Sequence, residues 1–475
     1  MSAILIEQLP PNLRWVNTQE TPDLSRYLGK VVLLHFWTAS SVACELHLGD
    51  IRRLESKFHD GLVVLGVHTP KLQAEADDGR LLKTLARWYI RHPVVNDREY
   101  ELWRRFGIQS WPSTVLLDHQ GMLAAVFPGV GRRAEIEEKI QSLLDAANEK
   151  DERNYDQPPS VSAFEARGVL RFPTRVVASD SYLYLADTGY NRILELSFEG
   201  RINRQFGSGN PGHWDARGTE AGFRDPVGLA LGREHLFVAD TGNHVIRRIR
   251  LMTGEVETLA GTGQWGIPRG TDFIAPRTVP LAMPTDLAML NDRLYIAMAG
   301  LHQIWQYDLG RNVLSVIAGT GREDATDGSG AFAAFSQPSG LAVAKDMLYV
   351  LCAGDSTLRS LRLYDGRVST LVAGNMFEVG SSDGALGQAR LAHAEALCLD
   401  AQRGVLWIAD SLNDKLRVYG LAKAELKTLN ANYKLQSPSG ICLAQNAVWI
   451  TNTDAHELLK LDLKTGRLGR VAIEE

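Results

Sequence analysis

The sequence predicts two domains in series, an α/β domain followed by an all-β propeller of six blades. Three observations lead to this prediction. Near the N-terminus, an apolar run, a helical pattern and a second apolar run follow one another in the order of a βαβ unit. A charged, proline-containing stretch without apolar periodicity comes next. Beyond it, short apolar strands and tight turns repeat six times at a period of about 40–55 residues, which is typical of propeller blades.

The first domain begins with the clearest of these patterns. Residues 31–37 read VVLLHFW, a β-branched apolar run that suits a central strand covered on both faces. Near-helical spacing of apolar residues over 46–58 predicts a helix, and 62–67 (LVVLGV) predicts a second buried strand. The other expected elements are helices over 81–90, 99–106 and 133–147 and strands over 93–95, 114–118 and 124–127.

The boundary between the domains is expected in a polar stretch. Residues 148–160 read NEKDERNYDQPPS, which is charged at first and then contains prolines. Such a composition is typical of an exposed interdomain linker. We therefore assign residues 1–148 to the α/β domain, 149–168 to the linker and 169–475 to the propeller.

Six repeats follow, and in each a second strand ends in a turn. These turns are LADTG (185–189), VADTG (238–242), IAMAG (296–300), VLCAG (350–354), IADSL (408–412) and ITNTD (450–454). Fourth strands are expected over 256–259, 313–317 and 368–372. Six such blades are expected to close a ring.

Composition limits the classes of function. The formal net charge of −5, with 23% charged and 45% hydrophobic residues, is typical of a soluble globular protein without a basic field for nucleic acid. Residues 1–10 contain no basic segment followed by an apolar one, and no run of about eighteen uncharged apolar residues follows. Four cysteines form no spacing framework, which fits a reducing compartment. We therefore predict a cytoplasmic protein without membrane or nucleic-acid partners; the oligomeric state stays open.

The second repeat carries a recognisable motif. Asn243, His244 and Val245 directly follow the turn at 238–242 and resemble the Asn-His-Leu signature for which NHL repeats are named. Residues 190–193 (YNRI) are a variant, whereas the motif fades in the third, fourth and sixth repeats. The region from residue 169 onward therefore resembles a six-bladed NHL β-propeller.

Two segments of the first domain carry a second resemblance. Residues 36–44 read FWTASSVAC, and residues 110–113 read SWPS. They are similar to the redoxin branch of the thioredoxin fold, in which a strand ends in Phe-Trp-Ala-Thr-Trp-Cys-x-x-Cys and a later x-Pro-Thr/Ser contains a cis proline. The order of thioredoxin-like domain, linker and NHL propeller resembles a known family of NHL-repeat-containing proteins over nearly the whole chain.

The resemblance implies a site at the start of the first helix, but its chemistry is incomplete. Thiol–disulfide exchange needs a thiolate at a helix N-terminus and a second thiol three residues later. Ser41 stands at the attacking position, where a hydroxyl cannot form a disulfide, and no neighbouring base is evident that would activate it. Cys44 stands at the resolving position, which is usually the more buried one. We interpret Cys44 as an inert, half-buried remnant; if it is exposed, it is the alternative candidate for a one-cysteine redox or peroxide sensor.

A cleft is expected beside this position. The resemblance implies a cis peptide bond between Trp111 and Pro112. With Trp37, Ser41 and Cys44, these residues would line a cleft that binds peptide without reacting with it. Alternatively, the two tryptophans simply pack the domain.

The repeats also place polar side chains at equivalent positions. His244, His302 and His456 recur in this way, and histidines that converge from separate blades can ligate a metal. Recurring turn residues more often tie strands together, so we predict no metal site. The same structural interpretation is given to the recurring turn aspartates and to the cysteines in strand-like contexts, namely Asp187, Asp240, Asp410, Cys352, Cys398 and Cys442.

One basic run needs a separate interpretation. Residues 244–250 read HVIRRIR, which is similar to the RNA-binding faces of some NHL propellers. Apolar Val245, Ile246 and Ile249 mark a buried strand, however, and the arginines are interpreted as its ordinary solvated face.

Two loops between blades are candidate binding sites. Loops 209–223 and 263–280 are too long for tight turns and contain Trp214 and Trp265, a residue type enriched in binding hot spots. These tryptophans either bind a partner or cap the blades beneath them. We predict a non-catalytic scaffold or interaction protein that binds a protein partner, without metal or cofactor. The alternative is a thiol-dependent oxidoreductase or peroxide sensor that uses Cys44.

Overall fold

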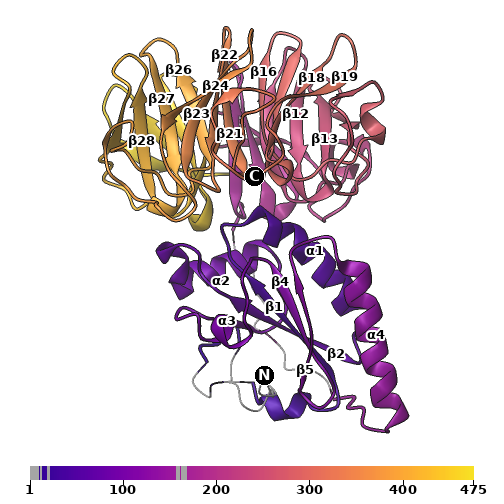
Figure 1. Ribbon diagram of the computed structural model, residues 1–475. Coiled ribbons are helices and arrows are strands. Elements are labelled where there is room, and N and C mark those ends of the chain that lie inside the picture. The colour runs from indigo at the N-terminus through magenta and orange to yellow at the C-terminus, as the bar shows by residue number, and fades with distance from the viewer. Residues whose placement is uncertain (1–9, 11–12, 19–21, 157–160, 162–167, 475) are drawn as a thin grey trace. The chain divides into compact units, whose positions relative to one another are not determined.

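The structure is a computed structural model, and it describes residues 10, 13–18, 22–156, 161 and 168–474. The chain divides into two compact units, residues 1–165 and 166–475 (Figure 1). The first is a thioredoxin-like α/β domain and the second a six-bladed β-propeller, so the predicted fold class is confirmed. Residues 157–160 and 162–167 of the predicted linker lie outside the described residues.

The early part of the predicted linker follows the surface of the first unit. The backbone N–H of Asn154 donates to the carbonyl of Gly29 at 3.0 Å, and its side-chain amide donates to the carbonyl of Leu28 at 3.0 Å. Arg153 also forms an ion pair with Asp60 at 3.4 Å. The charged composition of this segment therefore did not show whether it is a free linker or a segment held on the surface of the domain.

A five-stranded mixed sheet forms the centre of the first unit. Its strand order is β3-β2-β1-β4-β5; β1, β2 and β3 are parallel, β4 pairs antiparallel with β1, and β5 pairs antiparallel with β4. The strands are β1 (Val31–Trp37), β2 (Leu62–His68), β3 (Val94–Asn96), β4 (Ser113–Leu117) and β5 (Leu123–Pro128). Every residue of β1 and β2 is buried, which is why both strands appear in the sequence as continuous apolar runs.

In the described part of this unit, four helices cover the sheet. They are α1 (Val42–Lys57), α2 (Asp78–Arg87), α3 (Glu101–Arg105) and α4 (Arg133–Glu149), with short 3-10 turns at η2 (Leu24–Tyr27) and η3 (Gln73–Ala76). Apolar side chains of α1 and α4 pack on one face, and those of α3 pack on the other. Helix α2 packs beside the start of α1, in an apolar cluster that contains Trp37, Cys44 and Leu85.

The propeller consists of six antiparallel sheets, each built around four consecutive strands. The innermost strands are β6 (Pro173–Ala178), β11 (Pro226–Leu231), β16 (Pro284–Leu290), β21 (Pro338–Ala344), β26 (Ala396–Asp400) and β30 (Pro438–Ala444). The second strands are β7 (Leu183–Asp187), β12 (His235–Asp240), β17 (Arg293–Met298), β22 (Met347–Cys352), β27 (Val405–Asp410) and β31 (Ala447–Asn452). The third strands are β8 (Arg192–Leu196), β13 (Val245–Arg250), β18 (Gln303–Asp308), β23 (Thr357–Arg362), β28 (Lys415–Gly420) and β32 (Glu457–Asp462). The fourth strands are β9 (Ile202–Phe206), β14 (Glu255–Ala260), β19 (Val313–Ala318), β24 (Arg367–Val372), β29 (Glu425–Leu429) and β33 (Leu468–Val471).

Blades two to five have an additional outer strand. The loop that enters each of these blades adds a two-residue strand beside its fourth strand. These strands are β10 (Ala216–Arg217), β15 (Asp272–Phe273), β20 (Gly328–Ser329) and β25 (Gly384–Ala385). They cover part of an outer edge that would otherwise present unpaired backbone groups.

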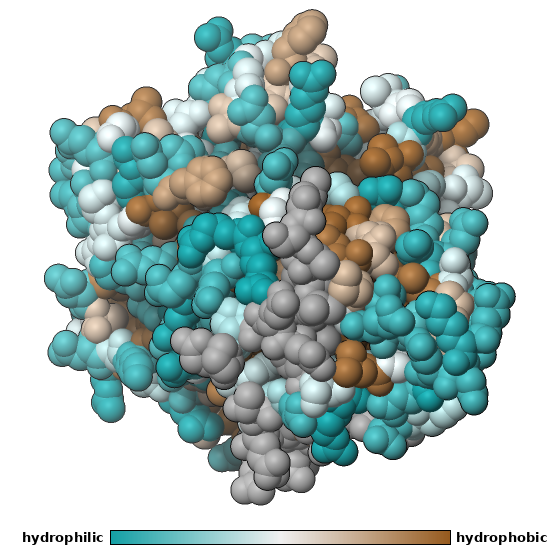
Figure 2. All heavy atoms as spheres, turned by 60° about the horizontal axis from the view of Figure 1, so that its bottom comes forward, coloured by the Kyte–Doolittle hydropathy of each residue, from teal (hydrophilic) through white to brown (hydrophobic). Residues whose placement is uncertain are grey.

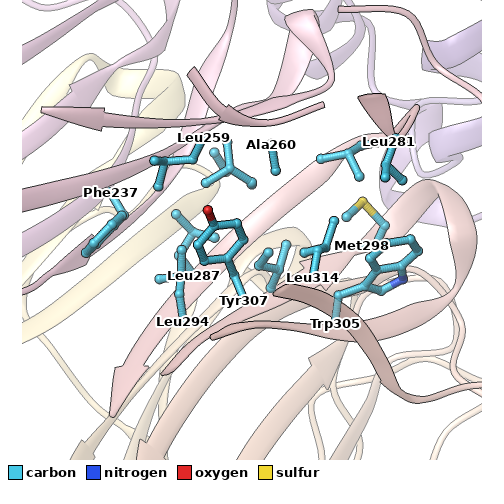
Figure 3. Close-up of a cluster of buried hydrophobic side chains, with 14 of the residues drawn as sticks. Phe237, Leu259, Ala260, Leu281, Leu287, Leu294, Met298, Trp305, Tyr307 and Leu314 are labelled. Carbon is cyan, nitrogen blue, oxygen red and sulfur yellow. The ribbon is translucent and has the colours of Figure 1, made fainter. Parts of the chain in front are cut away.

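Apolar cores fill the spaces between neighbouring blades. Figure 3 shows the core between the second and third blades, where Phe237 and Leu259 of one blade meet Leu294 and Tyr307 of the next. Each of the other blade junctions has a corresponding cluster. Because successive side chains of a strand point to opposite faces, every blade contributes to two cores.

Among the described residues, the ring closes through contacts between its ends and without an exchanged strand. The first blade uses the first four propeller strands, and the last blade uses the final four. Glu474 extends past the last strand and exchanges hydrogen bonds with the first blade, accepting from the N–H of Ile202 at 2.8 Å and donating to the carbonyl of Gly200 at 3.1 Å. Gly200 has a φ of 100°, and a Cβ there would lie 1.9 Å from the carbonyl oxygen of Ala472. The turn at this junction therefore requires glycine.

Candidate functional site

The thioredoxin-like site lies where β1 leads into α1. Ser41 is the N-cap of α1, with φ −121° and ψ 113°, and its hydroxyl accepts a hydrogen bond from the N–H of Cys44 at 3.4 Å. A serine at this position satisfies one of the free N–H groups of the first helical turn. In this site Ser41 thus acts as a helix cap, in the place where an attacking thiol would stand.

Cys44 is completely buried. Burial raises the pKa of its thiol to about 12, and the nearby carboxylate of Glu75 adds to the rise. Hydrogen bonds from Ser41 and Thr38 oppose this effect without cancelling it. A thiolate, which is the reactive species, is therefore scarce at neutral pH.

Glu75 is a site residue that sequence analysis missed. Its buried carboxylate accepts hydrogen bonds from the N–H of Ser40 at 2.6 Å, the N–H of Leu72 at 2.7 Å and the hydroxyl of Thr38 at 3.0 Å. It thereby fixes the backbone just before α1. The segment QAEADD at 73–78 carries no signal for this role, because its polar composition resembles any exposed turn.

Trp37 does not line a cleft, in contrast to the sequence-based expectation. Its side chain is fully buried and packs against His68 and Trp88, with ring centres 4.8 Å and 5.4 Å apart. The reason is that α2 and the segment after it cover the end of β1. Trp37 is therefore part of the apolar cluster that also encloses Cys44.

Trp111 and Pro112 retain the expected backbone geometry. Their peptide bond is cis, and the carbonyl of Pro112 accepts a hydrogen bond from Gly129 at 2.8 Å. Trp111 is half-buried against the Trp37 cluster, and its ring centre lies 4.4 Å from that of Trp103. Of the two tryptophans expected in the cleft, Trp111 is thus the one with accessible surface.

In the propeller, the recurring histidines bind the next blade and do not converge. The imidazole Nδ1 of His244 accepts the backbone N–H of Met283 at 3.3 Å, and equivalent bonds join His302 to Gln337 at 3.2 Å and His456 to Phe172 at 3.0 Å. Asn191, Ser356 and Asp414 occupy the same turn position in the other blades and accept the N–H groups of Asp225, His393 and Ser437. All six turn residues have left-handed backbones, with φ between 48° and 59°. We call these six hydrogen bonds the blade latches.

The recurring aspartates also have structural partners. Asp240 and Asp410 are buried, and each accepts hydrogen bonds from an arginine on the third strand, Arg247 and Arg417, at 2.9 Å and 2.7 Å. Asp187 pairs with Arg192 at 2.8 Å. Within the described residues, no group of three or more His, Cys, Asp or Glu side chains is arranged to hold a metal ion.

Arg247 corrects the interpretation of the basic run at 244–250. This arginine is fully buried and is not part of a solvated face. Its guanidinium donates to the carboxylates of Asp240 and Asp215 and to the carbonyl of Trp214, each at 2.9 Å. The alternation of apolar and polar residues predicted the apolar side of β13. It could not predict that an inter-blade loop covers the other side.

The two loop tryptophans differ in their packing. Trp214 is 46% exposed, and its indole N–H donates to the carbonyl of Glu220 at 2.6 Å. Trp265 is half-buried and packs on the core between the second and third blades, beside Leu281. Both positions belong to loops that connect one blade to the next, and we call the propeller face that carries these loops, 207–225, 261–283, 319–337 and 373–395, the loop face.

Figure 2 shows one side of the molecule, on which hydrophilic residues predominate and apolar residues form small, separate groups. On the loop face, the exposed large apolar side chains are Trp214, Ile267, Ile274, Phe332, Phe377 and Leu386. Among the described residues, no helix has the length and apolarity needed to span a membrane.

Comparisons with known proteins identify both parts of the chain. The family described as thioredoxin-like matches residues 29–123. NHL repeat-containing protein 2 of Gallus gallus is 31% identical over an alignment of 522 positions, which covers 99% of this chain and 72% of that protein. The protein of the same name from Homo sapiens is 30% identical, over 97% of this chain and 70% of its own length. Thiol-disulfide oxidoreductase YkuV of Bacillus subtilis is 26% identical over 27% of this chain and 87% of its own. With a thioredoxin-like domain, a six-bladed propeller and similarity over nearly its whole length, the chain belongs to the family of NHL repeat-containing protein 2.

Proposed function

We propose that this protein is a non-catalytic interaction protein whose propeller binds a protein partner on the loop face. The observation that carries the first half of the proposal is the state of the thioredoxin-like site. Ser41 stands at the attacking position as a helix cap, and Cys44 is fully buried with a pKa raised to about 12. Disulfide exchange needs an accessible thiolate with a partner thiol, and this arrangement supplies neither.

The distribution of apolar surface supports the second half. Most of the exposed large apolar side chains of the propeller lie on loops of the loop face, including Trp214, Phe332 and Phe377. Tryptophan and other aromatic side chains are enriched in binding hot spots. Asp215 and the Trp214 carbonyl both bind the buried Arg247, which holds this loop in one conformation. A fixed loop with an exposed aromatic side chain loses little conformational freedom when a partner binds.

The alternative is a thiol-dependent oxidoreductase or peroxide sensor that uses Cys44. It is favoured by the similarity of the first domain to a protein named as a thiol-disulfide oxidoreductase. It requires Cys44 to reach solvent, by an opening of α1 that the closed structure does not contain. The two proposals therefore differ in whether Cys44 is needed for the biological activity.

The test of the first half is direct. We expect the full-length protein to leave insulin disulfides intact in the presence of a thiol reductant, at the rate of the reductant alone. We expect the Cys44→Ser variant to behave identically in this assay and in cells that lack the wild-type gene. Turnover by the wild-type protein that Cys44→Ser abolishes would overturn the non-catalytic proposal and support the alternative.

The second half is tested by comparing two matched variants on opposite faces. Trp214→Ala removes an exposed side chain from the loop face, whereas Met252→Ala removes a 91% exposed side chain from the turn between β13 and β14. In cross-linking and affinity capture with the full chain, we expect Trp214→Ala to lose partners that Met252→Ala retains. If Trp214→Ala unfolds at lower urea concentration but captures the same partners, this tryptophan caps its blade and the proposed surface is wrong.

A further inference from the structure

Three histidine side chains lie in a row beneath α1, in the core of the thioredoxin-like domain. His35 on β1 is flanked in the sheet by Gly66 of β2 and Thr114 of β4. The ring of His47, on α1, lies edge-on to that of His35 with centres 5.3 Å apart. The ring of His92 lies over Gly66, where a Cβ would come within 3.2 Å of its Nε2. We call His35, His47 and His92 the histidine row.

The row ties α1 to the sheet at two points. Nε2 of His47 lies 2.8 Å from the hydroxyl of Thr114, and Nδ1 of His92 lies 3.0 Å from the carboxylate of Glu55, which is also on α1. All three histidines are buried, at 4% exposure or less. Both ring nitrogens of His35, Nδ1 of His47 and Nε2 of His92 have no hydrogen-bond partner among the described residues.

The surroundings offer little charge to stabilise a protonated imidazole at His35 or His47. Within the part of the chain that the structure describes, the carboxylate that contacts the row is that of Glu55, at the outer end beside His92. On β2, His68 packs against Trp37, and its Nδ1 lies 3.3 Å from Oδ1 of Asn96. The carboxylate of Asp50, also on α1, is paired with Arg133 of α4 at 3.5 Å.

Burial therefore keeps the rings of His35 and His47 neutral. It lowers the pKa of His47 to about 4, and it lowers the pKa of His35 well below its usual value, with further contributions from His47 and His92. When α1 separates from the sheet, the pKa of a solvated histidine returns to about 6.5. Between these two values the open form binds more protons than the closed form, so the closed form loses stability as the pH falls below about 6.5.

We propose that the histidine row is an acid-sensitive latch, in which protonation of His35 and His47 releases α1 from the sheet and exposes the site at Ser41 and Cys44. The three rings and their bonds to Thr114 and Glu55 hold the helix closed at neutral pH. In acid, the imidazoles of His35 and His47 become cations between apolar strands, and Nδ1 and Nε2 of each become donors for which the core supplies few acceptors. The release is local because the contacts of the row lie on α1, β1, β2 and β4 of the thioredoxin-like domain.

Cysteine accessibility measures this opening in the full-length protein. A pyridyl disulfide reagent is added at pH values from 7 to 5, and each labelled cysteine is identified by mass spectrometry of its peptide. Each rate is divided by that of an unstructured cysteine peptide at the same pH. From a pKa of about 4 in the closed form and about 6.5 in the open form, His47 alone should increase the labelling rate of Cys44 about 20-fold between pH 7 and pH 5.

The buried Cys352 of the propeller is the internal reference. We expect its labelling to rise much less than that of Cys44. An equal rise at both cysteines would mean global acid unfolding and would overturn the proposal. A labelling rate of Cys44 that stays constant from pH 7 to pH 5 would overturn it as well.

Two variants in the row and one control outside it assign the effect. His47→Gln keeps an amide near the Thr114 hydroxyl, but the glutamine does not titrate. The increase in the labelling rate of Cys44 between pH 7 and pH 5 should therefore be several-fold smaller than in the wild type. His35→Leu replaces a ring whose nitrogens have no hydrogen-bond partner among the described residues by an apolar side chain. It should therefore reduce the labelling rate of Cys44 at pH 7 and weaken the dependence of that rate on pH. His59→Gln alters an exposed histidine after α1 and should retain the wild-type response. If the labelling rate of Cys44 increases in both His47→Gln and His35→Leu as much as in the wild type, the proposal is wrong.

Discussion

Arg175 and Asp286 form a buried ion pair across the centre of the propeller, with 3.0 Å between Nε and Oδ1. They lie on the innermost strands of the first and third blades. The other nitrogens of Arg175 donate to the backbone carbonyls of Ser339, Glu395 and Ser439, in the fourth, fifth and sixth blades. One guanidinium thus joins five of the six inner strands around the axis.

The equivalent positions of the other inner strands hold small residues. Each lies two residues after the proline that begins the inner strand, or after Ala394 in the fifth blade. These residues are Gly228, Gly340, Ala396 and Gly440. A Cβ at Gly228 would lie 2.6 Å from the Cα of Asp286. The small residues therefore let the strands approach closely around a single central pair.

We predict that Arg175→Met destabilises the propeller by about 3–5 kcal/mol, because it leaves Asp286 buried without its cation. Arg175→Met combined with Asp286→Leu should recover part of this loss. Urea unfolding followed by tryptophan fluorescence measures both values. Arg233→Met, at an exposed position, is the matched control and should change the free energy of unfolding by less than about 0.5 kcal/mol. A loss below about 1 kcal/mol for Arg175→Met would show that the central pair does not hold the ring together.

The blade latch between the last and first blades should be sensitive to the acceptor at residue 456. His456→Ala removes the acceptor for the N–H of Phe172, and it places alanine at a position with a left-handed backbone. We therefore expect the free energy of unfolding to fall by about 1–2 kcal/mol. His456→Asn should retain most of the stability, since Asn191 performs this role between the first two blades. Thermal unfolding of the two variants side by side checks the prediction. Equal losses would mean that the latch hydrogen bond contributes nothing beyond the shape of the imidazole.

Restoring the missing thiol should reveal how much of the thioredoxin-like geometry remains. In Ser41→Cys the new thiol stands at the helix N-terminus, one turn before Cys44, where the helix dipole favours a thiolate. We expect mild oxidation to link residues 41 and 44, as detected by the loss of two hydrogens from one tryptic peptide. Val42→Cys places a thiol on a different side of the same helix and should not form this bond. Failure of Ser41→Cys to oxidise would mean that the buried position of Cys44 excludes the bond.

The two loop tryptophans should differ in their effects on stability. Trp265→Ala removes contacts with the core between the second and third blades, so we expect a loss of about 2 kcal/mol in the free energy of unfolding. Trp214→Ala removes a side chain that is nearly half exposed, and we expect a loss of about 1 kcal/mol. Urea unfolding of both variants provides the comparison. A larger loss for Trp214→Ala would identify it as the more important cap.

Strand patterns were predictable wherever burial was uniform. Residues 31–37 form β1 as expected, because a strand covered on both faces must be apolar throughout. The expected helix at 133–147 forms as α4, which ends two residues later. The apolar spacing over 46–58 indicated only the body of the first helix; the helix begins at Val42 with Ser41 as its cap, at the place that the resemblance over 36–44 implied.

The sequence by itself determined the two folds, the number of blades and the absence of an attacking thiol, because these depend on local periodicity and on the residue at one motif position. Tertiary structure decided what the polar side chains do. Arg247 is buried instead of solvated, and Trp37 is enclosed instead of lining a cleft, because a loop or helix distant in sequence covers each of them. The same holds for Arg175 and Asp286, which are 111 residues apart in the chain. Local patterns record which side of a strand is apolar, whereas the partner of a buried charge is set by the long-range packing that brings the blades together.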